Sequence, residues 1–389
     1  MSTYFDHNAT TPVAPEVVAA MAEALASTFG NASSVHAYGQ RAKAAIDEAR
    51  SSVATLIGAE AAEVVFTAGG TEADNFALRG AAEALEARGR KRLVSSTIEH
   101  EAVLNTCRHL ARRGHDWATV PVTSDGVVTA AALEGVLTPE TAIVSVMHAN
   151  NEIGTIQPVA DLAAMARAHG ALFHTDAVQT VGKVPVDVRA LGVDLLSLSA
   201  HKFNGPKGVG ALWIRRGVRL APILTGGRHE RNRRAGTENV AAIIGLGVAA
   251  RLALRHLREE AARLETLRDR LERGILGTVS GTVVNGGGAA RVPNTTNISF
   301  TGVEAESLLI ALDLEGVAVS TGSACSSGSL EPSHVLKAMG FPAHRTQNSL
   351  RFSLGSFSTE EEVDRVIAVL PGLVEKLRAL TRKPGGAVA

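Results

Sequence analysis

Six short runs of apolar residues recur between about residues 60 and 215, and alanine-rich segments with helical spacing separate them. Continuous rather than alternating apolar character is typical of strands that are buried on both faces. Such strands alternating with helices predict an α/β fold, with a mostly parallel sheet covered by helices. The runs are Glu63–Thr67, Leu93–Thr97, Ala142–Met147, Ala171–Thr175, Asp194–Leu198 and Val209–Ile214.

A long helical stretch rich in Arg and Glu follows Asn239 and runs to about Gly274, as a spine between two domains would. We expect a large domain over residues 15–256 and a small α+β domain made of residues 1–14 and 257–389. The elements expected in the small domain are strands near Asn297–Phe300, Val317–Ser320 and Leu350–Ser353, a helix near Glu304–Leu314 and a closing helix from about Thr359.

Composition narrows the class of protein. A chain of 389 residues with 45% hydrophobic residues can bury a large core. Thirty-nine basic and 39 acidic residues give a net charge of zero, so no basic field favours direct contact with nucleic acid or an anionic membrane. Two cysteines, Cys107 and Cys325, exclude a disulfide framework and a cysteine-rich zinc site, and they suit a reducing cytoplasm.

Neither a signal peptide nor a membrane span is expected. Asp6 and His7 lie where a signal peptide needs apolar residues. The longest smooth apolar run, Val240–Ala250, is shorter than the roughly 20 residues of a membrane-spanning helix. We therefore expect a soluble, cytoplasmic protein.

Polar residues that could take part in catalysis or ligand binding follow several of the predicted strands. Lys202 comes just after DLLSLS, and Asp176 and Gln179 follow the run that ends at Thr175. A lysine at a strand end can be desolvated and form a Schiff base, although an isolated lysine there is usually an ordinary surface residue. A buried carboxylate needs a cationic or proton-donating partner such as a pyridinium nitrogen, but Asp176 could equally cap a helix.

The turn Gly69-Gly70-Thr71 opens an alanine-rich helix after another strand. Glycines allow close backbone approach, and a helix N-terminus attracts phosphate, although this turn matches neither a Walker loop nor the three-glycine dinucleotide motif. His100 and Asn150 also lie at strand ends, where each by itself is more often structural. Their concurrence with a lysine, an aspartate and a glycine turn favours pyridoxal phosphate as cofactor.

Cys325 lies in the segment STGSACSSGS, whose small polar residues predict a mobile loop. An accessible thiol is prone to oxidation, so its presence indicates a function. Cys107, within EAVLNTCRHL, fits the commoner buried and inert cysteine. Arg351 could anchor a substrate carboxylate or serve as a salt-bridge partner.

Motifs over residues 3 to about 375 resemble those of the cysteine desulfurases, which belong to the class V aminotransferase group of pyridoxal-phosphate enzymes. The resemblance is closest to the nitrogen-fixation type and implies the type I fold, with a seven-stranded sheet in the large domain and the catalytic cysteine on a loop at about 320–332. The motifs are DHNATTP, FGNASSVHAYG, FTAGGTEADN, EHEAVL, VMHANNEIGTI, FHTDAVQTVGKVPVD, LSLSAHKFNGPKGVG, RRAGTENV, GSACSSGSLEPSHVLKAMG and SLRFSLG.

For the cofactor ring, the resemblance implies a role for each strand-end residue. Lys202 is implied as the Schiff-base lysine and the base at the substrate Cα, and Asp176 as the partner of the ring nitrogen. His100 is implied to stack on the ring, and it is our candidate for moving the thiol proton. Asn150 and Gln179 are implied to bond the ring hydroxyl region.

For the cofactor phosphate, the resemblance implies binding by Thr71, Ser199 and His201, with Gly70 in the same turn. Thr237 is implied to reach the phosphate of a neighbouring subunit, which predicts a homodimer with shared sites.

For the substrate, the resemblance implies that Arg351 holds the carboxylate of L-cysteine with Asn31 or Asn150 nearby. Cys325 is implied as the sulfur acceptor, giving L-alanine and a persulfide. The sulfur would pass to an iron–sulfur scaffold or another acceptor protein. No resident metal is expected, and Cys325 would meet an iron–sulfur cluster only during transfer.

Three other functions stay open at this point. A selenocysteine lyase or a class V aminotransferase would use the same cofactor cradle, but a transaminase has no use for a cysteine on a mobile loop. A non-catalytic sulfur-transfer scaffold is disfavoured because Lys202 and Asp176 are both present.

Overall fold

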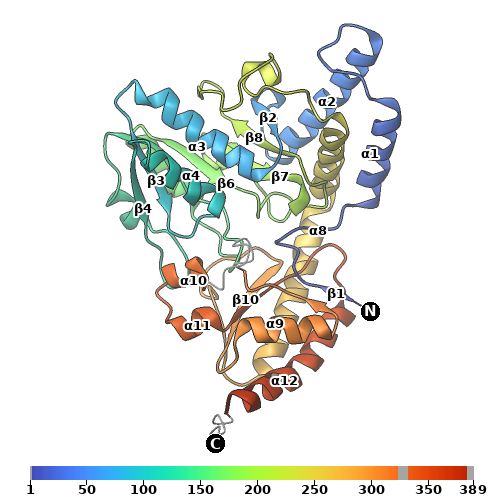
Figure 1. The fold of residues 1–389 in the computed structure, drawn as a ribbon, viewed down its shortest axis with the longest axis vertical. Helices are drawn as coiled ribbons and strands as arrows, with labels where there is room; N and C mark the ends of the chain where they lie inside the picture. The colour runs from blue at the N-terminus through green and yellow to red at the C-terminus, as the bar shows by residue number, and fades with distance from the viewer. Residues whose placement is uncertain (1, 323–331, 383–389) are drawn as a thin grey trace, which may run out of the picture.

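The computed structural model describes residues 2–322 and 332–382, and a seven-stranded sheet forms the centre of its large domain (Figure 1). The strand order is β2-β8-β7-β6-β5-β3-β4, and only β8 runs antiparallel to its neighbours. This confirms the predicted mostly parallel sheet. The strands are β2 (Val64–Thr67), β3 (Arg92–Ser96), β4 (Asp116–Val120), β5 (Thr141–Ser145), β6 (Leu172–Asp176), β7 (Leu195–Ser199) and β8 (Gly210–Ile214).

Helices cover both faces of this sheet. On one face, α3 (Gly70–Glu86) and α4 (Glu101–Ala111) form a core with Val65, Leu195 and Leu212. The other face packs Phe66 and Leu196 against a second set of helices. Neighbouring residues of one strand thus enter different cores, which explains the continuous apolar runs. The second set is α2 (Ala37–Leu56), α6 (Val159–Ala168) and the first part of α8 (Val240–Thr278), with α1 (Pro15–Ser27), α5 (Ala130–Glu134) and α7 (Val188–Leu191) nearby.

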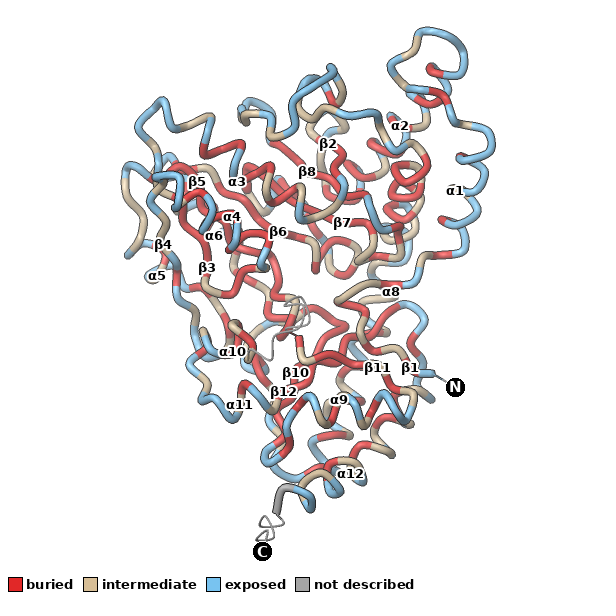
Figure 2. The backbone as a smooth tube through the Cα atoms, in the orientation of Figure 1, coloured by how far each residue is buried: buried red, intermediate tan, exposed pale blue. Residues whose placement is uncertain are grey.

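A smaller α+β region lies beneath the large sheet, and its two longest strands are fully buried (Figure 2). It holds an antiparallel sheet of order β12-β10-β9 and a parallel pair of β1 with β11. Its elements are β1 (Thr3–Tyr4), β9 (Thr282–Val284), β10 (Thr295–Phe300), α9 (Ala305–Leu314), β11 (Val317–Ala318), α10 (His334–Ala338), α11 (Ala343–Gln347), β12 (Ser349–Ser353) and α12 (Glu360–Arg382).

Helix α8 joins the two cores. Its first turns, Ala242–Ala250, pack into the large core, and Leu264–Ile275 pack into the small one. By length and composition α8 could cross a membrane, but a core helix meets the same criteria, and 44% of its most apolar stretch is buried here. The helix therefore acts as the predicted spine. The exact domain limits stay a prediction.

The sequence predicted the central strands to within about two residues but missed β4, β1 and β9. Strand β4 lies at an edge of the sheet and is partly exposed, so it lacks a continuous apolar run. Strands β1 and β9 contain two and three residues, too few for a periodic signal.

A buried ion pair completes the other edge of the large sheet. Arg50 donates to both carboxylate oxygens of Glu230, at 2.6 and 2.8 Å, and to the carbonyl oxygen of Val64. Glu230 in turn accepts from the backbone N–H of Phe66 at 3.0 Å. Because β2 pairs on one side only, these contacts satisfy backbone groups that a second strand would otherwise bond.

We predict that Glu230→Ala lowers the free energy of unfolding by about 3–5 kcal/mol, because it leaves Arg50 buried without its partner. Denaturant unfolding measures the change. Glu48→Ala is the matched control, since Glu48 pairs with Arg251 at an exposed site and should cost less than about 1 kcal/mol. Equal losses for the two variants would contradict a structural role for the buried pair.

Candidate active site

The glycine turn brings the start of α3 against two strand ends. Gly69 has a φ of 155°, which side chains rarely adopt, and a Cβ at Gly70 would lie 2.8 Å from Val178. The first bond of the helix runs from Ala73 N to Gly69 O, so the N–H groups of residues 70–72 precede the helical ladder. Ser199, at the end of β7, lies beside Gly69. These groups can hold a phosphate.

Thr71 and His100 line one hollow of about 510 Å³ at the carboxyl ends of the strands, together with Arg79 of α3. His201 lies on the other side of Ser199, with Nδ1 3.1 Å from Thr10 Oγ1. Burial lowers the pKa of His201 to about 4, so its imidazole is neutral at pH 7. A neutral His201 could contact a phosphate as a hydrogen-bond donor but not as a cation.

Asp176 ends β6 and is buried, with one carboxylate oxygen accepting from Val178 N at 2.9 Å. Burial raises its pKa, and the nearby positive charge of Lys202 acts against that rise. A cationic ring nitrogen beside this carboxyl would supply the charge that burial removes. The Asp176 carboxyl therefore fits the pyridine nitrogen of pyridoxal phosphate.

His100 caps α4, and this contact decides which ring nitrogen is available. Its Nδ1 accepts from Ala102 N at 3.1 Å, and burial lowers its pKa. The imidazole is therefore neutral with its proton on Nε2, so it can donate from Nε2. To take the thiol proton, His100 must first give up its hydrogen bond with Ala102 N. The role of His100 in moving that proton stays a prediction.

Lys202 points at the N-terminal segment. It lies in the 3₁₀ turn Ala200–Lys202, and its Nζ donates to the carbonyl oxygens of Asn8 and Ala9, at 2.6 and 2.8 Å. The sequence did not single out Asn8, although it lies within the DHNATTP motif. Its long-range bonds give no periodic signal along the chain.

The two amides expected near the ring hydroxyl differ in how they are held. Gln179 donates to Asn8 O at 3.0 Å and accepts from Lys183 Nζ at 2.7 Å. Asn150 is fully buried; it donates to Ile98 O and accepts from the N–H groups of Glu152 and Ile153. Both ends of the Asn150 amide thus stabilise a turn, and a cofactor bond would have to share one of them.

Arg351 lies in β12, and its guanidinium is already engaged. It donates to Asp6 at 2.5 Å and to Asn151 O at 3.0 Å, while its buried Nε has no hydrogen-bond partner among the described residues. A substrate carboxylate would meet Arg351 at that free position or in competition with Asp6. The Arg351 side chain is thus compatible with both hypotheses, a carboxylate anchor and an ion-pair partner.

Cys325 lies outside the described residues, but the chain on either side of its segment contacts the site. Ser320 and Arg351 exchange backbone bonds of 3.3 and 2.7 Å. Beyond the segment, Ser333 Oγ donates to Glu152 at 2.5 Å, and the His334 ring contacts Glu99 O at 3.0 Å. Cys107 is buried, and burial raises its pKa to about 12, as expected of an inert thiol.

Two predicted residues lie apart from this cluster within one subunit. Asn31 belongs to the exposed connection between α1 and α2 at the outer end of the large domain, and its side chain accepts from Ser33 N (Figure 1). Thr237 is exposed in the segment after Arg234, whose guanidinium pairs with Glu72 of α3. The chain by itself does not bring Asn31 to Arg351.

Beneath the strand ends lies a set of buried ionisable residues that the sequence did not reveal. Asp74 and His174 lie 3.6 Å apart, and Glu99 accepts from Ser96 Oγ and Met147 N. Burial raises the pKa of Asp74 well above its usual value and that of Glu99 to about 8. The nearby Asp176 charge raises both further. Among the described residues, no group of three or more His, Cys, Asp or Glu is arranged to hold a metal ion.

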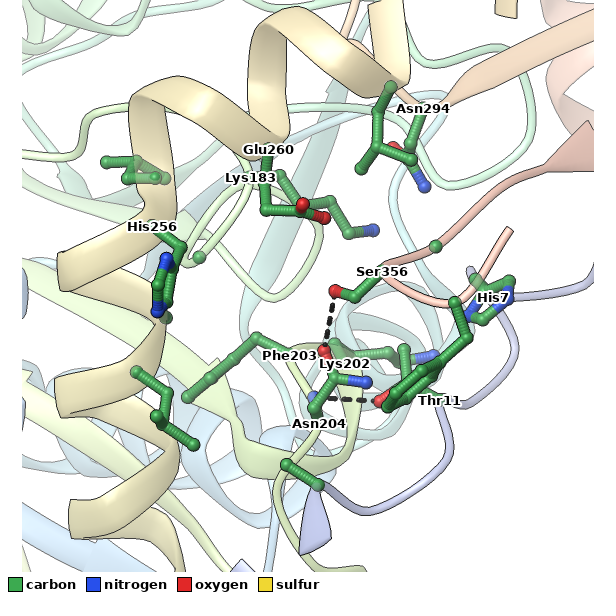
Figure 3. A pocket seen from close by; sticks show the side chains of 18 of the residues that line it. His7, Thr11, Lys183, Lys202, Phe203, Asn204, His256, Glu260, Asn294 and Ser356 are labelled. Atoms are coloured by element: carbon green, nitrogen blue, oxygen red, sulfur yellow. Dashed lines mark hydrogen bonds between the residues drawn. The ribbon is translucent and has the colours of Figure 1, made fainter. Parts of the chain in front are cut away.

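A cavity of about 410 Å³ lies behind Lys202 at the junction of the two domains (Figure 3). Apolar residues of α8 such as Leu252 and Leu264 form one wall, and Lys183 and His7 line another part. Asn204 on its rim bonds Ser356 and Thr11.

The raised pKa of Glu99 predicts a pH-dependent stability. The folded protein holds the Glu99 proton up to about pH 8, whereas the unfolded chain releases it near the ordinary glutamate pKa of 4.5. The free energy of unfolding should therefore fall as pH rises through this window. In Glu99→Gln the fall between about pH 5.5 and about pH 8.5 should be smaller, which urea unfolding at the two pH values measures.

Glu101→Gln serves as the control for that experiment, because Glu101 is exposed two residues along the chain. It should show the same fall as the unaltered protein. A Glu99→Gln profile that matches both would mean that Glu99 is ionised in the folded state at neutral pH.

Comparison with known proteins identifies the family to which the chain belongs. Residues 3–366 match the family described as Aminotransferase class-V. The chain is 50% identical over 378 residues to a cysteine desulfurase, IscS, of Dictyoglomus turgidum, covering 97% of this chain and 96% of the relative.

Solved structures agree with this relationship. A NifS-like protein superposes with a TM-score of 0.91 at 38% identity, covering 97% of this chain and all of the other. A structure described as SspA in complex with cysteine gives a TM-score of 0.82 at 35% identity, covering 92% of this chain and all of the other.

Proposed function

The chain belongs to the class V aminotransferase family and is a pyridoxal-phosphate-dependent cysteine desulfurase, and we propose that Cys325 is the thiol that takes the sulfur from L-cysteine. The observation that carries the proposal is the position of the chain on either side of Cys325. Ser320 bonds the backbone of Arg351, and His334 contacts the carbonyl of Glu99, the residue before His100. The Cys325 segment therefore begins and ends beside the groups that would hold the substrate.

In this proposal, the cofactor is held at three places. Gly70 and Thr71 at the start of α3, together with Ser199 and His201, would hold its phosphate. The buried Asp176 carboxyl would bind its ring nitrogen, and Gln179 and Asn150 would bond the ring hydroxyl region. Bound there, pyridoxal phosphate supplies an electron sink next to the substrate Cα.

Lys202 and His100 move protons in the proposed reaction. The amine of Lys202 takes the Cα proton, and its acceptors Asn8 O and Ala9 O keep it at the junction of the domains. His100 donates from Nε2, since Ala102 N–H occupies its other nitrogen. Arg351 orients the substrate carboxylate. Its guanidinium also donates to the carbonyl oxygen of Asn151, which brings the preceding residue, Asn150, close by.

The sulfur step balances without an external oxidant. The Cys325 thiolate attacks the sulfur of the substrate, an S–S bond forms, and the Cβ–S bond breaks. The electron pair left on carbon takes up a proton, which leads to L-alanine, and Cys325 holds the persulfide. A nucleophilic thiolate is needed because a neutral thiol is a poor nucleophile.

We further propose a homodimer in which Thr237 reaches the phosphate of the neighbouring subunit, and in which Asn31 contributes from the partner. The exposed position of both side chains supports this reading. An iron–sulfur scaffold or another sulfur acceptor protein in the cytoplasm would then take the persulfide sulfur.

The test of the acceptor compares the two cysteines. Cys325→Ala should retain the visible absorbance of bound cofactor, while alanine and sulfide formation from L-cysteine with a thiol reductant falls at least about a hundredfold. Cys107→Ala should retain activity, because the Cys107 thiol is buried against α3 and the sheet.

Full activity of Cys325→Ala would refute the assignment of Cys325. A protein that binds the cofactor but produces neither alanine nor sulfide from cysteine would point to a selenocysteine lyase or a class V aminotransferase. Added selenocysteine would reveal the first activity, and added keto acid the second.

A further inference from the structure

We propose that Lys183 is a positioning residue for the cofactor site: its amino group fixes the Gln179 amide and the Asn8 side chain, and through them the carbonyl that holds Lys202. The inference rests on the proposed function, because it takes Gln179 and Lys202 as cofactor-binding residues.

Lys183 is a buried amine that lacks a carboxylate partner among the described residues. Its exposed fraction is 7%, and burial lowers its pKa well below the usual value. The ionisable groups around it are Lys202, Arg351 and His7, and the Glu260 carboxylate, which lines the same cavity, is paired with Arg263. Burying such a group is costly, so its placement requires compensating contacts.

Two amide oxygens supply those contacts. Lys183 Nζ donates to Gln179 Oε1 at 2.7 Å and to Asn8 Oδ1 at 3.0 Å. Both donor bonds are available whether the amine carries two or three protons. Lys183 thus joins the loop after β6 to the N-terminal segment.

Backbone carbonyls fix the orientation of both amides. Gln179 Nε2 donates to Asn8 O, and Asn8 Nδ2 donates to Asn151 O. Since a carbonyl oxygen only accepts, each amide must turn its nitrogen toward the carbonyl and its oxygen toward Lys183. Lys183 is the donor that this arrangement needs.

The contacts converge on one atom of the site. The carbonyl oxygen of Asn8 accepts from Gln179 Nε2 at 3.0 Å and from Lys202 Nζ at 2.6 Å. A side chain without N–H groups at position 183 removes the Lys183 donor from Gln179 Oε1, so the Gln179 amide is free to rotate. Asn8 Oδ1 loses one of its two donors and keeps the bond from Asn294 Nδ2 at 3.0 Å. The contact of Gln179 with the ring hydroxyl and the alignment of Lys202 would then both weaken.

The test compares Lys183→Met, which removes the donors, with Lys183→Arg, which keeps them. Lys183 lines the 410 Å³ cavity, so the longer arginine has space to extend into (Figure 3). Lys91→Met is the control, because Lys91 is an exposed lysine paired with Glu86. The readouts are the dissociation constant of pyridoxal phosphate, the pH titration of the cofactor's visible absorbance, and kcat and KM for L-cysteine.

We expect Lys183→Met to weaken cofactor binding by roughly 5- to 100-fold, because a buried acceptor loses its donor. The absorbance titration should shift, and kcat should fall more than KM rises. Lys183→Arg should stay close to the unaltered protein in all three readouts, as should Lys91→Met. If Lys183→Met does not fold, Lys183→Gln replaces it in the test. The shorter glutamine side chain reaches less far, so cofactor binding and kcat should fall in the same direction but by a smaller factor.

A double-mutant cycle with Gln179→Leu separates this inference from the proposed function. If Gln179→Leu alone leaves cofactor binding and absorbance unchanged, the role of Gln179 in the proposed function is wrong. If it changes them, Lys183→Met should add little to Gln179→Leu, because both act on one amide. Fully additive losses, or a Lys183→Met protein with normal binding and titration, would overturn the role of Lys183.

Discussion

The hydrogen bonds of Asn8 hold the two domains and Lys202 in one arrangement. Its backbone N–H donates to Ser353 of β12, and its side chain bonds Thr295 and Asn294 at β10. Its carbonyl and side-chain oxygens accept from Lys202 and Lys183 of the large domain. A residue near the N-terminus thereby fixes the junction at which the cofactor and the substrate must meet.

Burial of charge at this junction explains much of the local chemistry. Asp74, Asp176 and Glu99 lie beneath one edge of the sheet, and Lys183 lies at the domain boundary, where the described part of the chain gives it no carboxylate partner. Each group favours its neutral form when it has no charged neighbour. A site of this kind favours a ligand that brings its own cation to Asp176 and its own anion to the start of α3, and pyridoxal phosphate carries both.

The substrate end of the site is organised around Arg351. Its backbone bonds Ser320, just before the segment with Cys325, while its guanidinium bonds Asp6 of the N-terminal segment. Binding of a substrate carboxylate at Arg351 would therefore affect the residue from which the Cys325 segment starts. In the proposed site, the residues that would hold the cofactor belong mainly to the large domain, whereas Arg351 and Cys325 belong to the small one.

The sequence by itself determined the alternation of buried strands and helices, and with it the sheet, the helical spine and the strand-end positions of Lys202, Asp176, His100 and Gly70. These follow from local periodicity, because parallel strands bring their carboxyl ends to one edge. Motif resemblance also indicated the family. Only the tertiary structure showed that Asn8 bonds Lys202 and Lys183, that Arg351 is paired with Asp6, and that Asn31 lies apart. Such contacts join residues more than 100 positions apart, and their geometry depends on how the two cores pack, which no local pattern encodes.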